Sequence, residues 1–165
     1  MTDSITYDAS YLHSPIGILK ILGNERTVVS IQFVEKIDTT PSLMLGEAVL
    51  NCIQQLEEYF NRSRQSFDIS LDFQGTPFQQ KVWEFLQGVD FGKTASYKDI
   101  AVEMDNLGAI RAIGRANGAN PFAIVIPCHR IIGSDGSLTG YAGELWRKKW
   151  LLDFEQQYKQ LSLFD

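Results

Sequence analysis

Residues 127–130 read Pro-Cys-His-Arg and directly follow an apolar run at residues 122–126. Proline lacks the backbone donor that a central strand uses, so the pattern predicts a strand that ends at Pro127 and presents the next side chains at its end. A cysteine is strongly nucleophilic once ionised, and a neighbouring imidazole or guanidinium favours ionisation. The alternative is an inert thiol, because free cysteine is often buried and adjacent strand residues face opposite sides. The tetrapeptide alone leaves both interpretations of Cys128 open.

Composition narrows the classes of protein to consider. The chain has 165 residues, 44% of them hydrophobic, and a net charge of −5. It has no apolar run long enough for a membrane span and no signal-peptide pattern at its start, so we expect an intracellular, cytoplasmic protein that binds no membrane. The two cysteines, Cys52 and Cys128, belong to no metal-spaced cluster, so neither a metal nor another cofactor is indicated.

Charge is distributed unevenly along the chain. Residues 1–90 carry 12 acidic and 6 basic side chains, whereas residues 91–149 carry 5 acidic and 8 basic ones. The overall negative charge argues against a protein that binds nucleic acid over its whole surface. The local basic excess fits a short DNA footprint on the second half, although a solvated helix face gives the same count.

The first half of the chain has the pattern of a small β-rich unit. Three strand-like stretches, expected to pair antiparallel, lie at residues 7–12, 17–22 and 28–33. Apolar residues spaced by three and four over residues 42–62 predict a helix with Cys52 on its buried face. Residues 67–71 alternate as in a short strand or an extended linker, and residues 72–75 mark a domain boundary.

The signals after that boundary are helical. Two capping-box patterns, at residues 76–79 and 96–99, start helices that we expect to end near Gly88 and Met104. A third helix is expected over residues 109–118. Two short helices joined by a tight, glycine-containing turn are typical of a helix-turn-helix, whose second helix enters a DNA groove. Many helical domains share this outline, so the pattern alone does not decide.

The third of these helices is unusually slim. Ile110 and Ile113 are expected to anchor it to the core, and Arg111 and Arg115 lie four residues apart on one face. Glycine inside a helix lowers its stability by about 1 kcal/mol, so the small residues indicate that another surface packs closely against this helix. A DNA minor groove, into which arginine is often inserted, is one interpretation. A helix packed tightly on its neighbour, with both arginines on carboxylates, is the other.

These segments, with several others, carry a resemblance to a known family. They are Gly75-Thr76-Pro77-Phe78-Gln79, Ser96-Tyr97, Arg111-Ala112-Ile113-Gly114, Asn120-Pro121, Ile126-Pro127-Cys128-His129-Arg130, Thr139-Gly140-Tyr141-Ala142-Gly143, and Arg147-Lys148 followed by Trp150-Leu151-Leu152. In this order, they resemble the methylated-DNA--protein-cysteine methyltransferases, or O6-alkylguanine-DNA alkyltransferases. The resemblance implies an α+β fold. A small, structural, ribonuclease-H-like domain over residues 1–74 would precede a helical DNA-binding and alkyl-transfer domain over residues 75–165, with a winged-helix-like helix-turn-helix unit.

The resemblance implies DNA repair by direct reversal of damage. Cys128 would take the alkyl group from O6-alkylguanine, and also from O4-methylthymine, after the base is flipped out through the minor groove. A thioether is not reversed in the cell, so each molecule would react once and need no cofactor. The implied partner is double-stranded DNA containing O6-alkylguanine, bound by a monomer.

The family's pattern also assigns the other residues of the site. The catalytic set would be Cys128, His129 as its base, Glu155 holding the imidazole, Tyr97 donating to the departing guanine, and Asn120 bracing the segment before the cysteine. The substrate and DNA contacts would be Arg111, which enters the base stack, with Arg115, Arg130, Tyr141, Ala142 through its backbone amide, Gly143 and Lys148. Without the family, Tyr97 covering a helix start and Glu155 pairing with Lys159 are simpler interpretations.

Glu144 departs from the family's pattern, because most members carry a glycine at that position. Its carboxylate could narrow the pocket rim or repel phosphate, unless an i, i+4 pair with Lys148 neutralises it. Two rival functions remain to be compared. Alkyltransferase-like proteins flag the damage without repairing it, but they typically carry tryptophan in place of Cys128. A thiol hydrolase would need an oxyanion hole and a substrate groove, and it offers no place for Arg111 on a slim helix.

Overall fold

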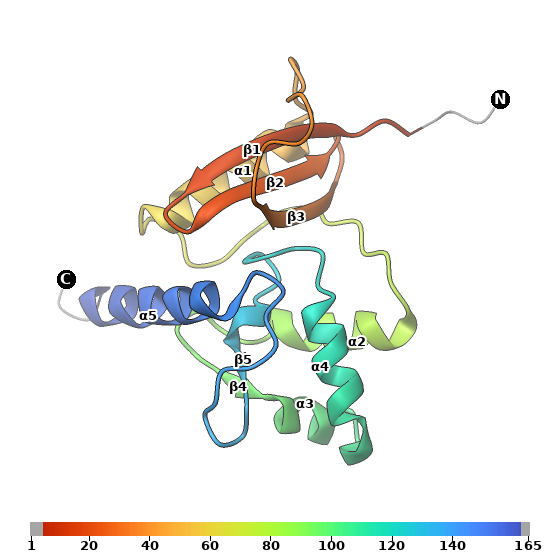
Figure 1. The fold of residues 1–165 in the computed structure, drawn as a ribbon, viewed down its shortest axis with the longest axis vertical. Coiled ribbons are helices and arrows are strands. Elements are labelled where there is room, and N and C mark those ends of the chain that lie inside the picture. The colour runs from red at the N-terminus through yellow and green to blue at the C-terminus, as the bar shows by residue number, and fades with distance from the viewer. Residues whose placement is uncertain (1–4, 163–165) are drawn as a thin grey trace. The chain divides into compact units, whose positions relative to one another are not determined.

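The computed structural model describes residues 5–162, and the chain divides into two compact units between Phe73 and Gln74. Each unit is described by itself (Figure 1). Together they form an α+β protein, as the sequence predicts. No helix within residues 5–162 is both long and apolar enough to cross a membrane.

The N-terminal unit is a three-stranded antiparallel sheet with one helix packed on it (Figure 1). The strands β1 (Asp8–Ser14), β2 (Gly17–Gly23) and β3 (Val28–Val34) pair in sequence order, and α1 spans Glu47–Phe60. Leu19, Ile21 and Ile31 of the sheet are fully buried, as is Cys52 of the helix. The three predicted strands and the buried position of Cys52 are therefore confirmed.

The helix α1 starts later than the apolar pattern predicts. It begins after Gly46, so residues 42–45 lie outside it. The Gly46 amide donates to Asp8 Oδ2 at 2.7 Å, and a Cβ at Gly46 would lie 2.3 Å from the Asn24 backbone. This close approach of two backbones fixes the chain at Gly46 and leaves the helix no room to start earlier.

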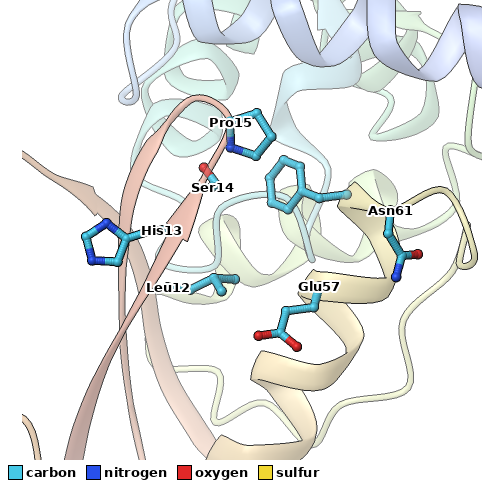
Figure 2. Close-up of a pocket in the computed structure, with 7 residues that line it drawn as sticks. Leu12, His13, Ser14, Pro15, Glu57 and Asn61 are labelled. Atoms are coloured by element: carbon cyan, nitrogen blue, oxygen red, sulfur yellow. The ribbon is translucent and has the colours of Figure 1, made fainter.

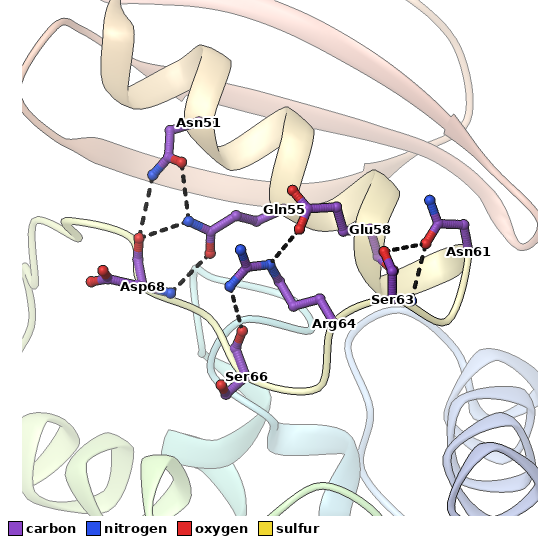
Figure 3. Close-up of polar contacts among 8 residues, drawn as sticks. All are labelled: Asn51, Gln55, Glu58, Asn61, Ser63, Arg64, Ser66 and Asp68. Atoms are coloured by element: carbon purple, nitrogen blue, oxygen red, sulfur yellow. Dashed lines mark hydrogen bonds and ion pairs between the residues drawn. The ribbon is translucent and has the colours of Figure 1, made fainter. Parts of the chain in front are cut away.

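The linker after α1 is held by side chains of the helix and, at residues 70–72, by backbone hydrogen bonds to Val28 of β3. Gln55 accepts from the Asp68 amide at 2.8 Å and donates to the Asp68 carbonyl at 2.9 Å, so its side chain replaces a strand partner (Figure 3). Arg64 pairs with Glu58 at 3.1 Å in the same cluster. Of the two predicted forms of residues 67–71, the linker is correct, with a single bridge between Val28 and Leu71.

The C-terminal unit is mostly helical. Its elements are α2 (Pro77–Gln87), β4 (Ala95–Ser96), α3 (Tyr97–Glu103), the 3-10 helix η1 (Leu107–Ala109), α4 (Ile110–Gly118), the 3-10 helix η2 (Cys128–Arg130), β5 (Ile131–Ile132) and α5 (Leu145–Ser162). Both predicted capping boxes are present, with Thr76 and Gln79 at α2 and Ser96 and Asp99 at α3. The short strands β4 and β5 pair in parallel.

The helices α3 and α4 form the predicted helix-turn-helix, and α4 also packs on α2 (Figure 1). Trp83 of α2 donates its indole N–H to the Ala116 carbonyl at 2.9 Å, so the small Ala116 makes room for a large ring. Ile113 is fully buried, as expected, but the expectation that Ile110 anchors the helix is wrong, because Ile110 is 42% exposed. It shares a helix face with the buried Ile113 and Asn117 but stands at the first turn of α4, where it remains exposed.

Candidate active site

The apolar run before Cys128 does not form the predicted strand. Residues 123–125 are in turns, held by the Asn120 side chain, which accepts from the Phe122 amide at 3.0 Å and donates to the Ile126 carbonyl at 2.8 Å. Because one asparagine satisfies backbone groups that a strand partner would otherwise bind, the segment folds back on itself. Ile124 has a φ of 71°, a strained conformation for a β-branched residue. Asn120 thus braces the segment that delivers Cys128.

Cys128 begins the 3-10 helix η2, so it and His129 are neighbours on a helical turn rather than opposite faces of a strand. The thiol residue is 4% exposed. Asn117 of α4 lies beneath it and donates to the Cys128 carbonyl at 3.3 Å. Sequence reasoning missed Asn117, although a signal existed: it follows the buried Ile113 by four residues, which places a polar side chain on the buried face of α4.

His129 and Glu155 form a buried pair. His129 Nε2 lies 2.7 Å from Glu155 Oε2, and both side chains are almost completely shielded from solvent. Burial alone would raise the pKa of Glu155, but the charge that His129 carries when protonated, the hydrogen bonds from His129 and Arg130, and the guanidinium charge hold it well below its usual range. An ionised carboxylate only accepts, so Nε2 carries the imidazole proton and Nδ1 keeps its lone pair. The alternative of an exposed Glu155–Lys159 pair is wrong.

Arg130 fixes the carboxylate of Glu155 and is not an exposed DNA contact. Its Nε lies 2.8 Å from Glu155 Oε1 and its Nη2 lies 3.1 Å from Oε2, while Nη1 donates to the Val89 carbonyl at 2.7 Å. The residue is 6% exposed, so the expected contact of Arg130 with DNA is corrected to a role inside the protein. Two bonds from one guanidinium leave Glu155 a single orientation.

The environment of Cys128 keeps its thiol protonated at rest. Burial raises the pKa of Cys128, and the Asn120 side chain and the charge of Lys148 oppose this only in part. Burial likewise lowers the pKa of His129, against the influence of Glu155, so the imidazole is neutral at pH 7. A neutral base beside a buried thiol is the arrangement in which a proton is removed as the nucleophile attacks.

Polar atoms without a protein partner gather around this thiol. Within residues 5–162, three buried side-chain atoms have none: Asn117 Oδ1, His129 Nδ1 and Tyr141 Oη. Buried polar groups are ordinarily hydrogen-bonded, so a cluster of exceptions marks a place where water or a substrate binds. Burial raises the pKa of Tyr141, and the nearby Cys128 adds to the effect, so its hydroxyl remains a neutral donor.

Tyr97 and Lys148 meet at one backbone carbonyl. Tyr97 Oη donates to the Thr139 oxygen at 2.9 Å, and Lys148 Nζ donates to the same oxygen at 2.8 Å. Lys148 is fully buried, with Nζ 5.8 Å from the centre of the Tyr97 ring. The expectation that Lys148 contacts DNA is therefore corrected: its ammonium lies inside the domain. Burial lowers its pKa to about 8, so it remains mostly charged at pH 7.

The loop that precedes α5 holds the remaining expected residues. Gly143 accepts at its carbonyl from Arg147 Nη1 at 3.1 Å, which ties the loop to the helix, and Ala142 is exposed. Glu144 has a φ of 75° and accepts from the Trp146 indole at 2.9 Å. The predicted Glu144–Lys148 pair does not form, because Glu144 lies before the helix and is exposed whereas Lys148 is buried. The carboxylate thus faces solvent.

The exposed face of α4 presents Arg111 and Arg115 beside a hollow of about 420 Å³, lined also by Tyr97, Ile110, Gly114, Thr139 and Gly140. Within residues 5–162, neither arginine has a carboxylate within 4.0 Å. A Cβ at Gly114 would come no closer than 4.0 Å to the neighbouring Tyr97 ring, and one at Gly118 would meet open space. Internal packing therefore explains the small residue at Ala116 but not these glycines. The glycines favour the interpretation that α4 approaches an external partner rather than a tightly packed neighbouring helix.

A second hollow, of about 310 Å³, lies in the N-terminal unit. It is lined by Leu12, His13, Ser14, Pro15, Glu57, Phe60 and Asn61. Figure 2 shows Glu57 and Leu12 facing each other across it and His13 on the other side of the strand. Ser14 Oγ donates to the Gly17 carbonyl at 2.7 Å and is used by the turn. This hollow brings together no nucleophile and base comparable to Cys128 and His129.

Comparison with known proteins decides the family. Residues 77–157 match the family model described as the DNA-binding domain of 6-O-methylguanine DNA methyltransferase, and residues 8–73 match its ribonuclease-like domain. The chain belongs to the methylated-DNA--protein-cysteine methyltransferase family. Members of this family repair alkylated DNA directly, by moving the alkyl group to one of their own cysteines.

The similarity to individual members of the family extends over nearly the whole chain. The methylated-DNA--protein-cysteine methyltransferase of Mycolicibacterium paratuberculosis is 42% identical over 157 residues, which cover 92% of this chain and 95% of the relative. The crystal structure of the O6-methylguanine methyltransferase of Mycobacterium tuberculosis aligns with a TM-score of 0.84 at 39% identity, covering 97% and 100% of the two chains. A structure of that protein in complex with DNA aligns with a TM-score of 0.81 at 41% identity, covering 94% and 98%. The predicted family and fold are confirmed.

Proposed function

We propose that this methyltransferase transfers the alkyl group of O6-alkylguanine in duplex DNA to Cys128, once per molecule. The observation that carries the proposal is the buried arrangement of Cys128, His129 and Glu155, in which the imidazole keeps Nδ1 open while Nε2 is held at 2.7 Å by the carboxylate. The family membership supplies the reaction type, and the presence of cysteine at position 128 separates the chain from damage-flag proteins.

The transfer requires the thiol to lose a proton and the departing guanine to accept the electron pair of the broken C–O6 bond. His129 Nδ1 takes the Cys128 proton, directly or through a water, and Glu155 stabilises the imidazolium that forms. The S–C bond forms as the C–O6 bond breaks, and the electron pair stays on guanine. A donor hydroxyl stabilises that anion, and in this proposal it comes from Tyr97, which lines the hollow beside α4. The resulting thioether has no route back to a thiol, so the protein is consumed.

The helix α4 provides the face that approaches DNA. A base inside a duplex is out of reach of a buried thiol, so the nucleotide must be flipped out. The glycines and exposed arginines of α4 suit a minor groove about 6 Å wide, and in this proposal Arg111 fills the gap left in the base stack. The proposed partner is thus double-stranded DNA carrying O6-alkylguanine, bound by a monomer.

Arg111→Ala should slow transfer from O6-methylguanine in a duplex far more than transfer from free O6-benzylguanine. The free base needs no flipping, so we expect its rate to change less than threefold, whereas loss of one inserted arginine costs the duplex reaction about 10- to 100-fold. Single-turnover kinetics with both substrates measure the ratio. Arg26→Ala, which removes an exposed arginine of the N-terminal unit, is the matched control and should change neither rate. Equal losses with both substrates would contradict the insertion role.

The fate of the alkyl group tests the transfer itself. One equivalent should appear on Cys128 and none on Cys52, which is buried and whose pKa burial raises to about 12. Tight binding to the damaged duplex without any transfer would place the protein among the damage flags instead.

A further inference from the structure

Two donors from different helices converge on the Thr139 carbonyl. One is the Tyr97 hydroxyl of α3, at 2.9 Å, and the other is the Lys148 ammonium of α5, at 2.8 Å. Thr139 itself is in the exposed loop between β5 and α5. Gly140, which follows it, has a φ of 61°, and a Cβ there would lie 3.2 Å from the Tyr97 hydroxyl. The loop backbone therefore passes directly over the end of the tyrosine.

Lys148 is in an unfavourable environment for a cation. It is fully buried, and no carboxylate within residues 5–162 lies within 4.0 Å of its Nζ. Its contacts are the Thr139 oxygen and the face of the Tyr97 ring, with Cys128 and His129 near enough for their pKa values to respond to its charge. A buried ammonium without a carboxylate costs more free energy than an apolar side chain of the same length. Packing alone does not account for a lysine here.

The proposed function requires the Tyr97 hydroxyl to change its hydrogen-bond acceptor during the reaction. A tyrosine hydroxyl has one proton to donate, and in this structure that proton is bonded to the Thr139 oxygen. Donation to the departing guanine requires the hydroxyl to give up that bond. If Tyr97 were its only protein donor, the Thr139 carbonyl would lose that partner at this step, and the loop would lose a bond that holds it in place. With Lys148 bonded to the same oxygen, the carbonyl keeps a partner throughout.

We propose that Lys148 is a positioning residue that holds the Thr139 carbonyl, so that the Tyr97 hydroxyl is released to the leaving guanine while the loop stays in place. The inference rests on the proposed function, because it assigns Tyr97 the role of donor. Lys148 touches neither the thiol nor the base in this account and acts through Tyr97. Its effect should accordingly appear only in reactions whose leaving group needs a donor.

A double-mutant cycle with two alkylating agents tests the inference. Lys148→Met keeps the length of the side chain and removes the donor, and Tyr97→Phe removes the hydroxyl. Lys149→Met is the matched control, since Lys149 is exposed and pairs with Asp153 at 2.7 Å on the surface. Each variant is reacted with free O6-benzylguanine, whose guanine must leave as an anion, and with iodoacetamide, whose iodide leaves without help. Thermal unfolding establishes that each variant is folded.

Loss of one preorganised donor typically costs about 10²–10³-fold, and Lys148→Met hinders the Tyr97 donor without removing it, so we expect it to slow the O6-benzylguanine reaction by about 10- to 100-fold. In the Tyr97→Phe background the same change should cost less than about threefold, and the iodoacetamide rate should change by less than about threefold throughout. Lys149→Met should match the parent protein. If Lys148→Met does not fold, Lys148→Gln, which keeps a donor, is expected to retain most of the parent rate. Tyr97→Phe should then slow the Lys148→Gln variant as much as it slows the parent protein.

Two results would overturn the inference. Equal slowing by Lys148→Met with and without the Tyr97 hydroxyl would show that Lys148 does not act through it. Equal slowing with iodoacetamide would place the effect at the thiol. Failure of the unaltered protein to take up the benzyl group is a separate result, and it would overturn the proposed function first.

Discussion

His129→Gln is expected to slow alkyl transfer from O6-benzylguanine by about 10²–10⁴-fold at neutral pH, the range typical for loss of a general base. The physical reason is the state of the thiol: burial raises the pKa of Cys128, so the proton has to be removed during attack. In the proposed function, the neutral imidazole removes it, with Nδ1 open and Nε2 held by Glu155. Single-turnover kinetics measure the loss.

The transfer rates of the unaltered protein and of His129→Gln should depend on pH in different ways. Burial lowers the pKa of His129, so the base form persists below pH 6.5, the ordinary value for imidazole, and the unaltered protein should keep its rate there. The rate of His129→Gln should instead rise steadily with pH as the thiolate forms, towards and beyond the ordinary cysteine pKa of 9.0. His13→Gln, at an exposed histidine of the N-terminal unit, is the control. A loss below tenfold, with a flat pH profile, would show that His129 is not the base.

Glu155→Gln is expected to lower the free energy of unfolding by about 3–5 kcal/mol at pH 7, because it leaves a buried guanidinium without its counter-charge. Glu155 is 1% exposed and receives two bonds from Arg130 and one from His129. Urea titration at several pH values measures the difference between the two proteins. Asp153→Asn, which breaks an exposed pair with Lys149 two residues away, should change the free energy by no more than about 0.5 kcal/mol.

The same pair predicts how stability depends on pH. The folded-state pKa of Glu155 is held below its unfolded value, so its contribution is complete above about pH 4.5 and is lost as the pH falls towards the folded-state pKa. The difference between the unaltered protein and Glu155→Gln should therefore shrink as the solution is acidified below pH 4.5. A difference that stays constant down to pH 2 would mean that the charge of Glu155 does not stabilise the fold.

Local chemistry made much of the fold predictable. The capping boxes at Thr76 and Ser96 set the starts of α2 and α3, because they satisfy backbone donors within three residues and depend on nothing distant. The start of α1 was mispredicted for the opposite reason. It is set at Gly46 by a backbone segment some 20 residues earlier in the chain, at Asn24, and no apolar spacing reports such a contact.

In the site too, some features could be predicted from the sequence, whereas others depend on contacts between distant segments. The family's pattern singled out Cys128, His129, Glu155, Tyr97 and Asn120. In the fold, His129 bonds to Glu155, Asn120 bonds to the segment before the cysteine, and Tyr97 donates to the Thr139 carbonyl. The apolar run before Cys128 reads as a strand, but Asn120 supplies the hydrogen bonds that a neighbouring strand would. The family's pattern assigned Arg130 and Lys148 to the substrate and DNA contacts, and only the tertiary structure shows that both are buried.

The most direct test of the account is the mass of the Cys128 peptide after reaction with a duplex that carries a single O6-methylguanine. We expect one added methyl group on Cys128, none on the Cys52 peptide, guanine restored in the DNA, and no further repair when more duplex is supplied. An unmodified Cys128 peptide beside repaired DNA would contradict it, as would repair that continues beyond one lesion per protein molecule.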